Sequence, residues 1–272
     1  MNLAHKFDQW TDRLNPVLLK ELRQTVRSGA LLAALISVSA VLLIALVVQL
    51  GAMGASLALN RPIGREVFAV LASMLEFFAI VIIPINAGAR LFAERKPHDV
   101  ELFYASPLTA GRIIRGKLAS ASYETFLLFS LCAPFLFITT VLRGIDVVTV
   151  AAVLLLGFLL VLAAVQVAIF VGCFAVHHAI KAVLAAIALV VAGAGLMSIY
   201  LHAVQVMVLK GVGGYLHDLT SGNGIGICGI FVTVVSVLHG MSVAIIANAG
   251  GQMELADGTP TSPQVAHPQN HF

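Results

Sequence analysis

Charge is what this sequence has least of. Charged residues make up only 11% of its 272 residues, whereas hydrophobic residues make up 60%. A soluble globular domain carries about a quarter charged residues, because its surface must be hydrated. The shortage of charge, together with a mean hydropathy of +0.99, excludes that class. It predicts an all-α polytopic membrane protein.

Cysteine is scarce as well, and the three present are Cys132, Cys173 and Cys228. Each lies within a different long apolar segment, so neither a disulfide framework nor a zinc site is expected. The same segments hold few histidines and acids, and these do not gather at one membrane depth. Enzymes need such convergent groups. We therefore expect no metal site and no catalytic site in this chain.

Six long apolar runs dominate what is present. Each is long enough to cross a hydrocarbon core of roughly 30 Å, which takes about 20 residues of helix. The predicted spans are 28–50, 67–89, 119–142, 147–176, 182–201 and 224–249. Together they predict one transmembrane domain over residues 28–249.

Two polar segments flank this domain. In residues 1–27, Asn15 and Pro16 form a helix-start signal, and the leucines that follow share one face while basic residues occupy another. Such a segment predicts an amphipathic helix lying on the membrane surface rather than a cleavable signal peptide. Residues 250–272 are rich in proline and polar residues, which predicts a disordered tail.

The basic residues predict an orientation. With the N-terminus inside, twelve of the sixteen Lys and Arg residues fall on the cytoplasmic side and four on the outer side. Cytoplasmic loops carry such an excess. The sequence thus predicts a multi-pass protein of the cytoplasmic (inner) membrane with both termini in the cytoplasm.

The richest polar stretch is 90–118, between the second and third spans. It holds six of the sixteen basic residues and three acids, which suggests that it faces a soluble partner. Its GRIIRGK stretch matches seven positions of a phosphate-binding loop, but Leu118 stands where the motif needs Ser or Thr. No buried strand precedes it either. We therefore expect no nucleotide site in this chain.

Two polar residues deep within the apolar spans stand out, Glu76 and His239. A carboxylate near a bilayer centre is costly unless it is protonated, paired or facing water. Two interpretations of Glu76 stay open: it lines a cavity or subunit interface, or it is a protonated group hydrogen-bonded within the bundle. His239 similarly belongs to a translocation path or is a neutral imidazole bonded to a neighbouring helix.

One stretch carries a family resemblance. The amphipathic NPVLLKELRQTVRS, the loop ERKPHDVELFYASPLTAGRIIRGKL after the second span, and the six spans resemble a type 2 ABC transporter permease. That family often has E-R-E-x-G-T-[LV]-E-x-L-x-x-[ST]-P-[LI] here. The chain matches it at Glu94, Arg95, Val100, Glu101, Ser106, Pro107 and Leu108. It departs from it at Lys96, Pro97, His98 and Asp99.

The resemblance implies the membrane subunit of an ATP-driven exporter, working as a dimer with a second permease copy or a homologue. A cytoplasmic ABC ATPase would bind ATP and Mg²⁺, so this chain would hold no cofactor. The resemblance implies a cytoplasmic coupling helix over 99–104 that docks on the ATPase. The implied contact residues are Glu94, Arg95, Asp99, Glu101, Leu102, Phe103 and Tyr104.

Around this interface, Arg112, Arg115 and Lys117 are expected to meet lipid phosphates. Membrane lipids are thus further partners, and nucleic acid is not expected. The resemblance also implies short re-entrant helices in the outer loop over 202–223.

Two other functions remain open. A stand-alone secondary transporter or channel would have inverted repeats with charged or glycine-broken spans in matching halves. No convincing repeat is visible. A non-transporting anchor or assembly subunit would use the polar loop only to recruit its soluble partner.

Overall fold

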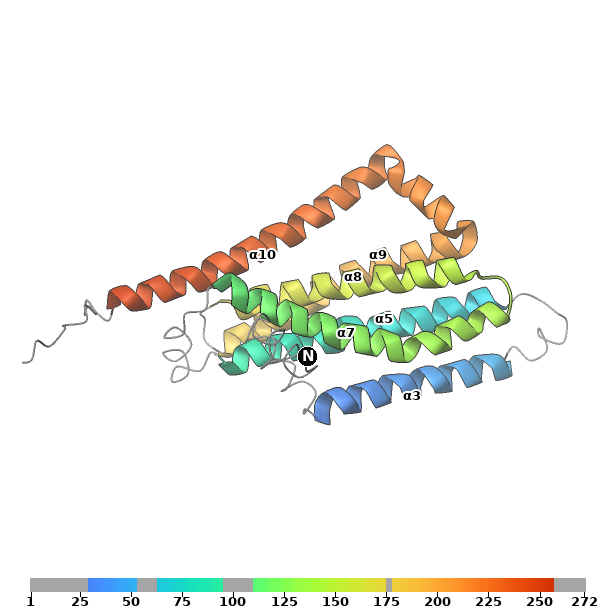
Figure 1. Ribbon diagram of the computed structural model, residues 1–272, viewed down its shortest axis with the longest axis horizontal. Coiled ribbons are helices and arrows are strands. Elements are labelled where there is room, and N and C mark those ends of the chain that lie inside the picture. The colour runs from blue at the N-terminus through green and yellow to red at the C-terminus, as the bar shows by residue number, and fades with distance from the viewer. Residues whose placement is uncertain (1–28, 53–62, 95–109, 175–177, 257–272) are drawn as a thin grey trace, which may run out of the picture.

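The computed structural model describes residues 29–52, 63–94, 110–174 and 178–256, and in these ranges every regular element is an α-helix (Figure 1). The helices are α3 (Gly29–Ala52), α5 (Gly64–Glu94), α7 (Ala110–Val141), α8 (Val147–Gly172), α9 (His178–Thr220) and α10 (Gly222–Ala256). All six are long and apolar enough to cross a membrane. For these residues the predicted all-α class is thereby confirmed, and so is the presence of six helices long and apolar enough to span a membrane.

The helices differ from the predicted spans mainly at their ends. α7 begins at Ala110, nine residues before the predicted span, and α9 continues to Thr220. Hydropathy marks the part of a helix that crosses hydrocarbon, and a helix continues past it wherever its backbone bonds remain satisfied. α8 ends at Gly172, before the predicted end, because Cys173 caps it by donating its backbone N–H to carbonyls of the last turn.

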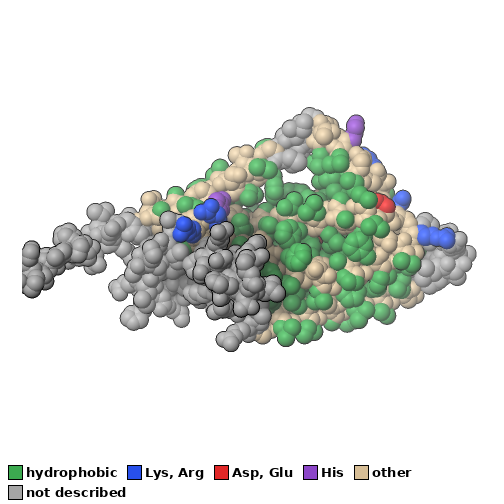
Figure 2. Space-filling model, viewed as in Figure 1, with side chains coloured by type: hydrophobic (Ala, Val, Ile, Leu, Met, Phe, Trp, Pro, Cys, Tyr) green, Lys and Arg blue, Asp and Glu red, His purple; other side chains and the backbone are tan. Residues whose placement is uncertain are grey.

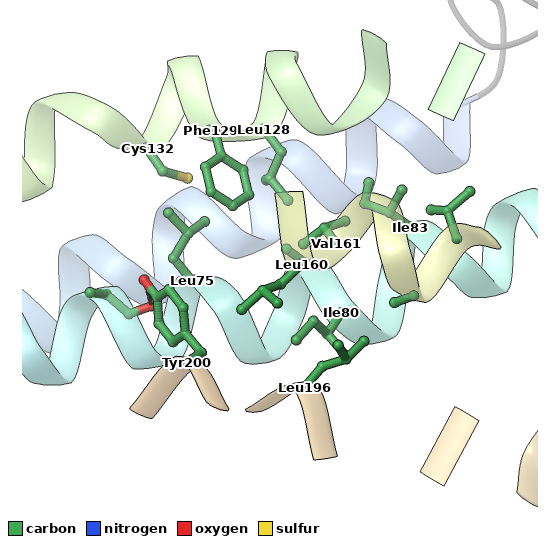
Figure 3. Close-up of a cluster of buried hydrophobic side chains, with 14 of the residues drawn as sticks. Leu75, Ile80, Ile83, Leu128, Phe129, Cys132, Leu160, Val161, Leu196 and Tyr200 are labelled. Atoms are coloured by element: carbon green, nitrogen blue, oxygen red, sulfur yellow. Dashed lines mark hydrogen bonds between the residues drawn. The ribbon is translucent and has the colours of Figure 1, made fainter. Parts of the chain in front are cut away.

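Four helices form the centre of the bundle. α5 and α8 pack against each other and against both α7 and α9, α3 lies against α5 and α7, and α10 lies against α7, α8 and α9. Figure 1 shows α3 along one edge and α10 along the opposite one. The central helices bury a continuous apolar cluster that includes Leu75, Phe129, Leu160 and Tyr200 (Figure 3).

The outer surface is apolar between the two ends of the bundle. Figure 2 shows hydrophobic side chains spread over the broad face, with Lys and Arg near its ends. Val48 on α3, Val191 on α9 and Val232 on α10 are each more than 60% exposed. Apolar surface on this scale is unfavourable in water and suits helices that face lipid.

The end where α7 meets α8, called here the α7–α8 end, is closed by polar contacts. The Gly64 N–H donates to the Arg143 carbonyl at 3.0 Å, and Arg65 Nε donates to the Gly144 carbonyl at 2.6 Å. A Cβ at position 64 would overlap the Arg143 carbonyl, so only glycine allows this approach. Asp146 caps α8 by accepting hydrogen bonds from the backbone N–H and hydroxyl of Thr149.

α9 breaks at Gly211, whose φ of 74° and ψ of 175° are accessible in practice only to glycine. Lys210 Nζ and Asp218 Oδ2 form an ion pair across the break at 2.8 Å. Beyond the break the chain turns away from the bundle and returns as α10 (Figure 1). The region over 202–223 is therefore largely helical, with one sharp turn at Gly211 and another at Ser221, where α9 ends and α10 begins (Figure 1).

The flanking segments are only partly described. The expected amphipathic helix in 1–27 and most of the expected tail lie outside the described residues. The tail was expected from Gly250, but α10 continues to Ala256. The residues QMELA are good helix formers and extend the helix past the two glycines.

Candidate functional site

Glu76 lies near the middle of the second span. It comes twelve residues after Gly64, the first residue of α5, and the span runs from Gly64 to Leu91. At a rise of 1.5 Å per residue it is about 18 Å along a span of about 42 Å. Glu76 is therefore close to the bilayer centre, as the sequence predicted.

Its carboxyl group is fully enclosed by protein. Glu76 is 0% exposed, and neither carboxyl oxygen has a hydrogen-bond partner. An unpaired, ionised carboxylate in such surroundings is far more costly than the neutral acid. The first interpretation, a carboxylate lining a cavity or a subunit interface, does not describe this conformation, because the side chain is enclosed within one chain. The second is right about burial and wrong about hydrogen bonding.

Four helices meet around this carboxyl group. A Cβ built on Gly157 of α8 would overlap Glu76 Oε2 and lie 3.2 Å from both Phe129 of α7 and Tyr200 of α9. Gly157 thus leaves the space that the carboxyl group and the two rings share. Figure 3 shows Phe129 and Tyr200 converging from their separate helices. We call Glu76, Phe129, Gly157 and Tyr200 the Glu76 cluster.

Tyr200 closes one side of the cluster. It is 1% exposed, and its hydroxyl donates to the Ala72 carbonyl at 3.4 Å, one helical turn before Glu76 on α5. The phenol therefore ties α9 to the backbone of α5 and leaves the carboxyl group unpaired. A polar group in this condition stores an unfavourable interaction of about 1–3 kcal/mol that a conformational change can relieve.

An ion pair between a partly buried and a buried side chain lies nearer the end where α5 ends and α7 begins, called here the α5–α7 end. Arg90 Nη1 and Glu124 Oε1 are 2.6 Å apart, with side chains 19% and 2% exposed. Arg90 comes fourteen residues after Glu76, about 21 Å further along α5. Lys117, Ser120 and Glu124 recur at helical spacing on α7, and all three are buried. The expectation that Lys117 meets lipid phosphates is therefore wrong, whereas Arg112 and Arg115 are exposed.

His239 belongs to a third polar contact, between α8 and α10. Its Nδ1 lies 3.3 Å from Gln166 Oε1, and Gln166 Nε2 donates to Ser242 Oγ at 3.5 Å. Gln166 follows Gly157 by nine residues, about 13 Å along α8. The structure thus does not bring His239 to Glu76. It places His239 in the role of an imidazole bonded to a neighbouring helix.

The predicted partner-interface residues are not placed. Arg95, Asp99, Glu101, Leu102, Phe103 and Tyr104 lie outside the described residues. Glu94 is the last residue of α5, and its side chain is also outside the description. Within the described part of the chain, no three His, Cys, Asp or Glu side chains come close enough to hold a metal ion.

Sequence reasoning missed Phe129, Gly157 and Tyr200, and also the pairing of Arg90 with Glu124. Gly157 carried a usable signal, because an isolated glycine inside a long apolar helix often marks a close approach. Phe129 and Tyr200 carried no such signal, since their role depends on how three helices are rotated about their axes.

Comparison with known proteins adds no assignment. Neither a scan against models of protein families nor a search of curated proteins finds a match to this chain.

Proposed function

We propose that this protein is the membrane-spanning permease subunit of an ATP-driven ABC exporter. It would bind a separate cytoplasmic ATPase through its 94–108 loop, and that ATPase would hold ATP and Mg²⁺. The observation that carries the proposal is that a single helix, α5, runs from Glu94 at the start of this loop to the Glu76 cluster, with Pro84 inside it. A push on the loop would therefore reach the bilayer centre through a single helix.

The ion pair supports this route. The two helices that flank the loop, α5 and α7, are held together by Arg90 and Glu124. Opposite charges 2.6 Å apart resist separation, because their attraction is strong in a medium of low dielectric. The two helices would then move together when the partner ATPase closes. Glu76 on α5 and Phe129 on α7 would move with them relative to Gly157 and Tyr200.

The unpaired carboxyl group gives such a movement a chemical consequence. In the described conformation Glu76 has no hydrogen-bond partner. Separation of α5 from α8 would expose it to water or to a polar substrate, which would supply the missing partner. The Glu76 cluster is therefore our proposed part of the translocation path.

The charges at the two ends support an orientation. Among described residues, Arg90, Arg112, Arg115 and Lys117 lie towards the α5–α7 end. Arg65, Arg143 and Lys210 lie towards the α7–α8 end. We propose that the α5–α7 end is cytoplasmic, in agreement with the positive-inside rule for the whole chain. That side is the one accessible to a soluble ATPase, and a second permease copy would complete the transporter.

Co-purification tests the proposal. The tagged full chain is solubilised gently from native membranes and its partners are identified. We expect an ABC ATPase in about equal amounts with the wild type and none with Glu101→Arg combined with Leu102→Asp, because the change reverses a contact charge and removes an apolar anchor. A matched control at the other end is Asp218→Arg combined with Leu216→Asp, both exposed positions. Absence of any ATPase from the wild-type complex would overturn the proposal.

The alternatives predict other results. A stand-alone secondary transporter, which the deep carboxyl group of Glu76 favours, would transport after reconstitution without any ATPase. An anchor subunit would retain a soluble partner but would not change that partner's rate of ATP hydrolysis. Measurement of ATP hydrolysis with and without the permease separates the three.

A further inference from the structure

A pocket of about 270 Å³ lies between α5, α8 and α9, on the α5–α7 side of the Glu76 cluster. Its walls are three short helix segments. They contribute Pro84, Ile85, Gly88 and Ala89 from α5; Ala164, Val167, Ala168 and Val171 from α8; and Ala185, Ala186, Ala188, Leu189, Ala192 and Gly193 from α9.

The lining selects an apolar occupant. All fourteen side chains are apolar, and nine of them are Ala or Gly. A buried water needs two to four polar partners, and an apolar cavity of about 150 Å³ stays dry and takes up small hydrocarbons. The larger pocket here is therefore unfavourable for water and favourable for a hydrocarbon group.

Two close helix contacts bound the pocket along the membrane normal. Towards the α5–α7 end, a Cβ on Gly172 would lie 2.5 Å from the Leu91 side chain. Towards the bilayer centre, a Cβ on Gly193 would lie 3.3 Å from the Ile80 side chain. Ile80 and Leu91 are eleven residues apart on α5, about 16 Å. The pocket, called here the slot, lies between these two contacts, because its lining on α5 falls between Ile80 and Leu91.

The open side of the slot faces the bilayer. Ile85 is 49% exposed, and Ala89 and Ala186 are also exposed. All three lie within membrane-spanning segments. At this depth the surrounding medium is lipid hydrocarbon. The molecules that can reach the slot sideways are therefore membrane lipids.

We propose that this pocket binds one hydrocarbon chain of a membrane lipid, inserted between α5, α8 and α9. Small side chains usually let helices pack closely, yet these three segments leave space that a chain fills. An inserted chain replaces missing van der Waals contacts, which stabilises the bundle in proportion to the apolar area it covers. This proposal does not depend on ATP-driven transport, so the two proposals are tested independently.

Photo-crosslinking tests the site in the wild-type protein. The full chain is reconstituted into phosphatidylcholine vesicles containing a phosphatidylcholine with a diazirine on one acyl chain. After illumination, labelled peptides are identified by mass spectrometry. We expect label concentrated in 164–171 and 185–193 and far less on the exposed faces of α3 and α10. Label spread evenly over all lipid-facing helices would overturn the proposal.

A matched pair of variants tests the pocket itself. Ala192 lines it, whereas Ala194, two residues further along α9, is exposed and does not. We expect Ala192→Phe to reduce labelling of 164–171 about tenfold, the effect of losing about two buried methylene groups. Ala194→Phe should leave it unchanged. If Ala192→Phe fails to fold, Ala168→Leu on the facing helix repeats the test with a smaller side chain. Equal labelling of the pocket-filling variant and the control would overturn the assignment.

Discussion

Glu76 and Gly157 share one space at the centre of the bundle, because the carboxyl group of the first occupies the position where a Cβ of the second would lie. The contact joins α5 to α8, and half of the 26 residues of α8 are buried. The unpaired carboxyl group of Glu76 therefore fits in the bundle because residue 157 is a glycine, and the two residues are best explained together.

Gly157→Ala should destabilise the protein. The added methyl group would overlap Glu76 Oε2 and crowd Phe129 and Tyr200, and overpacking of this kind costs about 1–3 kcal/mol. We expect a lower thermal unfolding midpoint in detergent. Removal of the carboxyl group in Glu76→Ala combined with Gly157→Ala should restore part of the loss.

The control for this prediction is Gly195→Ala. Gly195 also lies in a membrane-spanning helix, but a Cβ there would meet no atom within 4 Å. Alanine is favoured over glycine within helices by about 0.5–1 kcal/mol, so this variant should be neutral or slightly more stable. Equal destabilisation by both alanines would show that the Glu76 contact is not the cause.

Glu76→Met should stabilise the protein and impair its function. Methionine is of similar length and removes a buried polar group that has no partner, which is worth about 1–3 kcal/mol. Thermal unfolding measures the gain. ATP hydrolysis by the reconstituted complex measures the loss, and Glu76→Gln separates the effect of size from that of the acidic proton. If Glu76→Gln and Glu76→Ala both keep full transport, Glu76 has no functional role.

The pair of Arg90 and Glu124 should show strong coupling. Arg90→Met leaves Glu124, which is 2% exposed, without this cation, and breaking a buried pair costs about 3–5 kcal/mol. Glu124→Met should cost a similar amount, whereas the double variant should cost much less than the sum. A thermal-unfolding cycle of the four proteins measures this coupling. Additive losses would mean that the pair does not hold α5 to α7.

The sequence predicts the helices better than the site. Apolar runs are local, so the six spans could be found without knowledge of their neighbours. Glu76 could be found as well, because a charged residue in an apolar run is anomalous in any arrangement. Its surroundings could not. Phe129 and Tyr200 look like ordinary core residues until the rotation of α7 and α9 is known.

The role of His239 shows the same limit. The residue stands out in the sequence, but its partner Gln166 lies 73 positions away. Only the packing of α10 on α8 distinguishes a tethering contact from a translocation path. The prediction for Lys117 was wrong for a related reason. Its basic charge indicated contact with lipid phosphates, whereas its burial depends on which face α7 turns to α5.

Gly211→Ala should disturb the turn between the two segments of α9. A φ of 74° with a ψ of 175° is a conformation essentially restricted to glycine, and forcing another residue into it costs about 1–3 kcal/mol. We expect a lower unfolding midpoint and faster proteolysis between 205 and 222. Gly213→Ala is the matched control, because Gly213 has no positive φ and no neighbour within 4 Å of a built Cβ. Equal effects of both substitutions would contradict the prediction.

Asp146 should make stability depend on pH at the start of α8. Hydrogen bonds from the Thr149 hydroxyl and backbone to the carboxylate lower the pKa of Asp146 below its ordinary value. Because the folded-state pKa is the lower one, the stabilisation is complete above the unfolded pKa of about 3.9 and is lost as the pH falls through the folded value. Asp146→Asn keeps a capping side chain that does not titrate.

Unfolding midpoints measured from pH 7 to pH 3 check this. The difference in unfolding midpoint between the wild type and Asp146→Asn should be constant near neutral pH. Below about pH 4 the midpoint of the wild type should fall relative to that of the variant. Asp146→Ala should lose about 1 kcal/mol at pH 7, the usual cost of removing an N-cap. Parallel curves for wild type and Asp146→Asn down to pH 3 would mean that the carboxylate contributes nothing beyond its shape. The cap would then act through geometry alone.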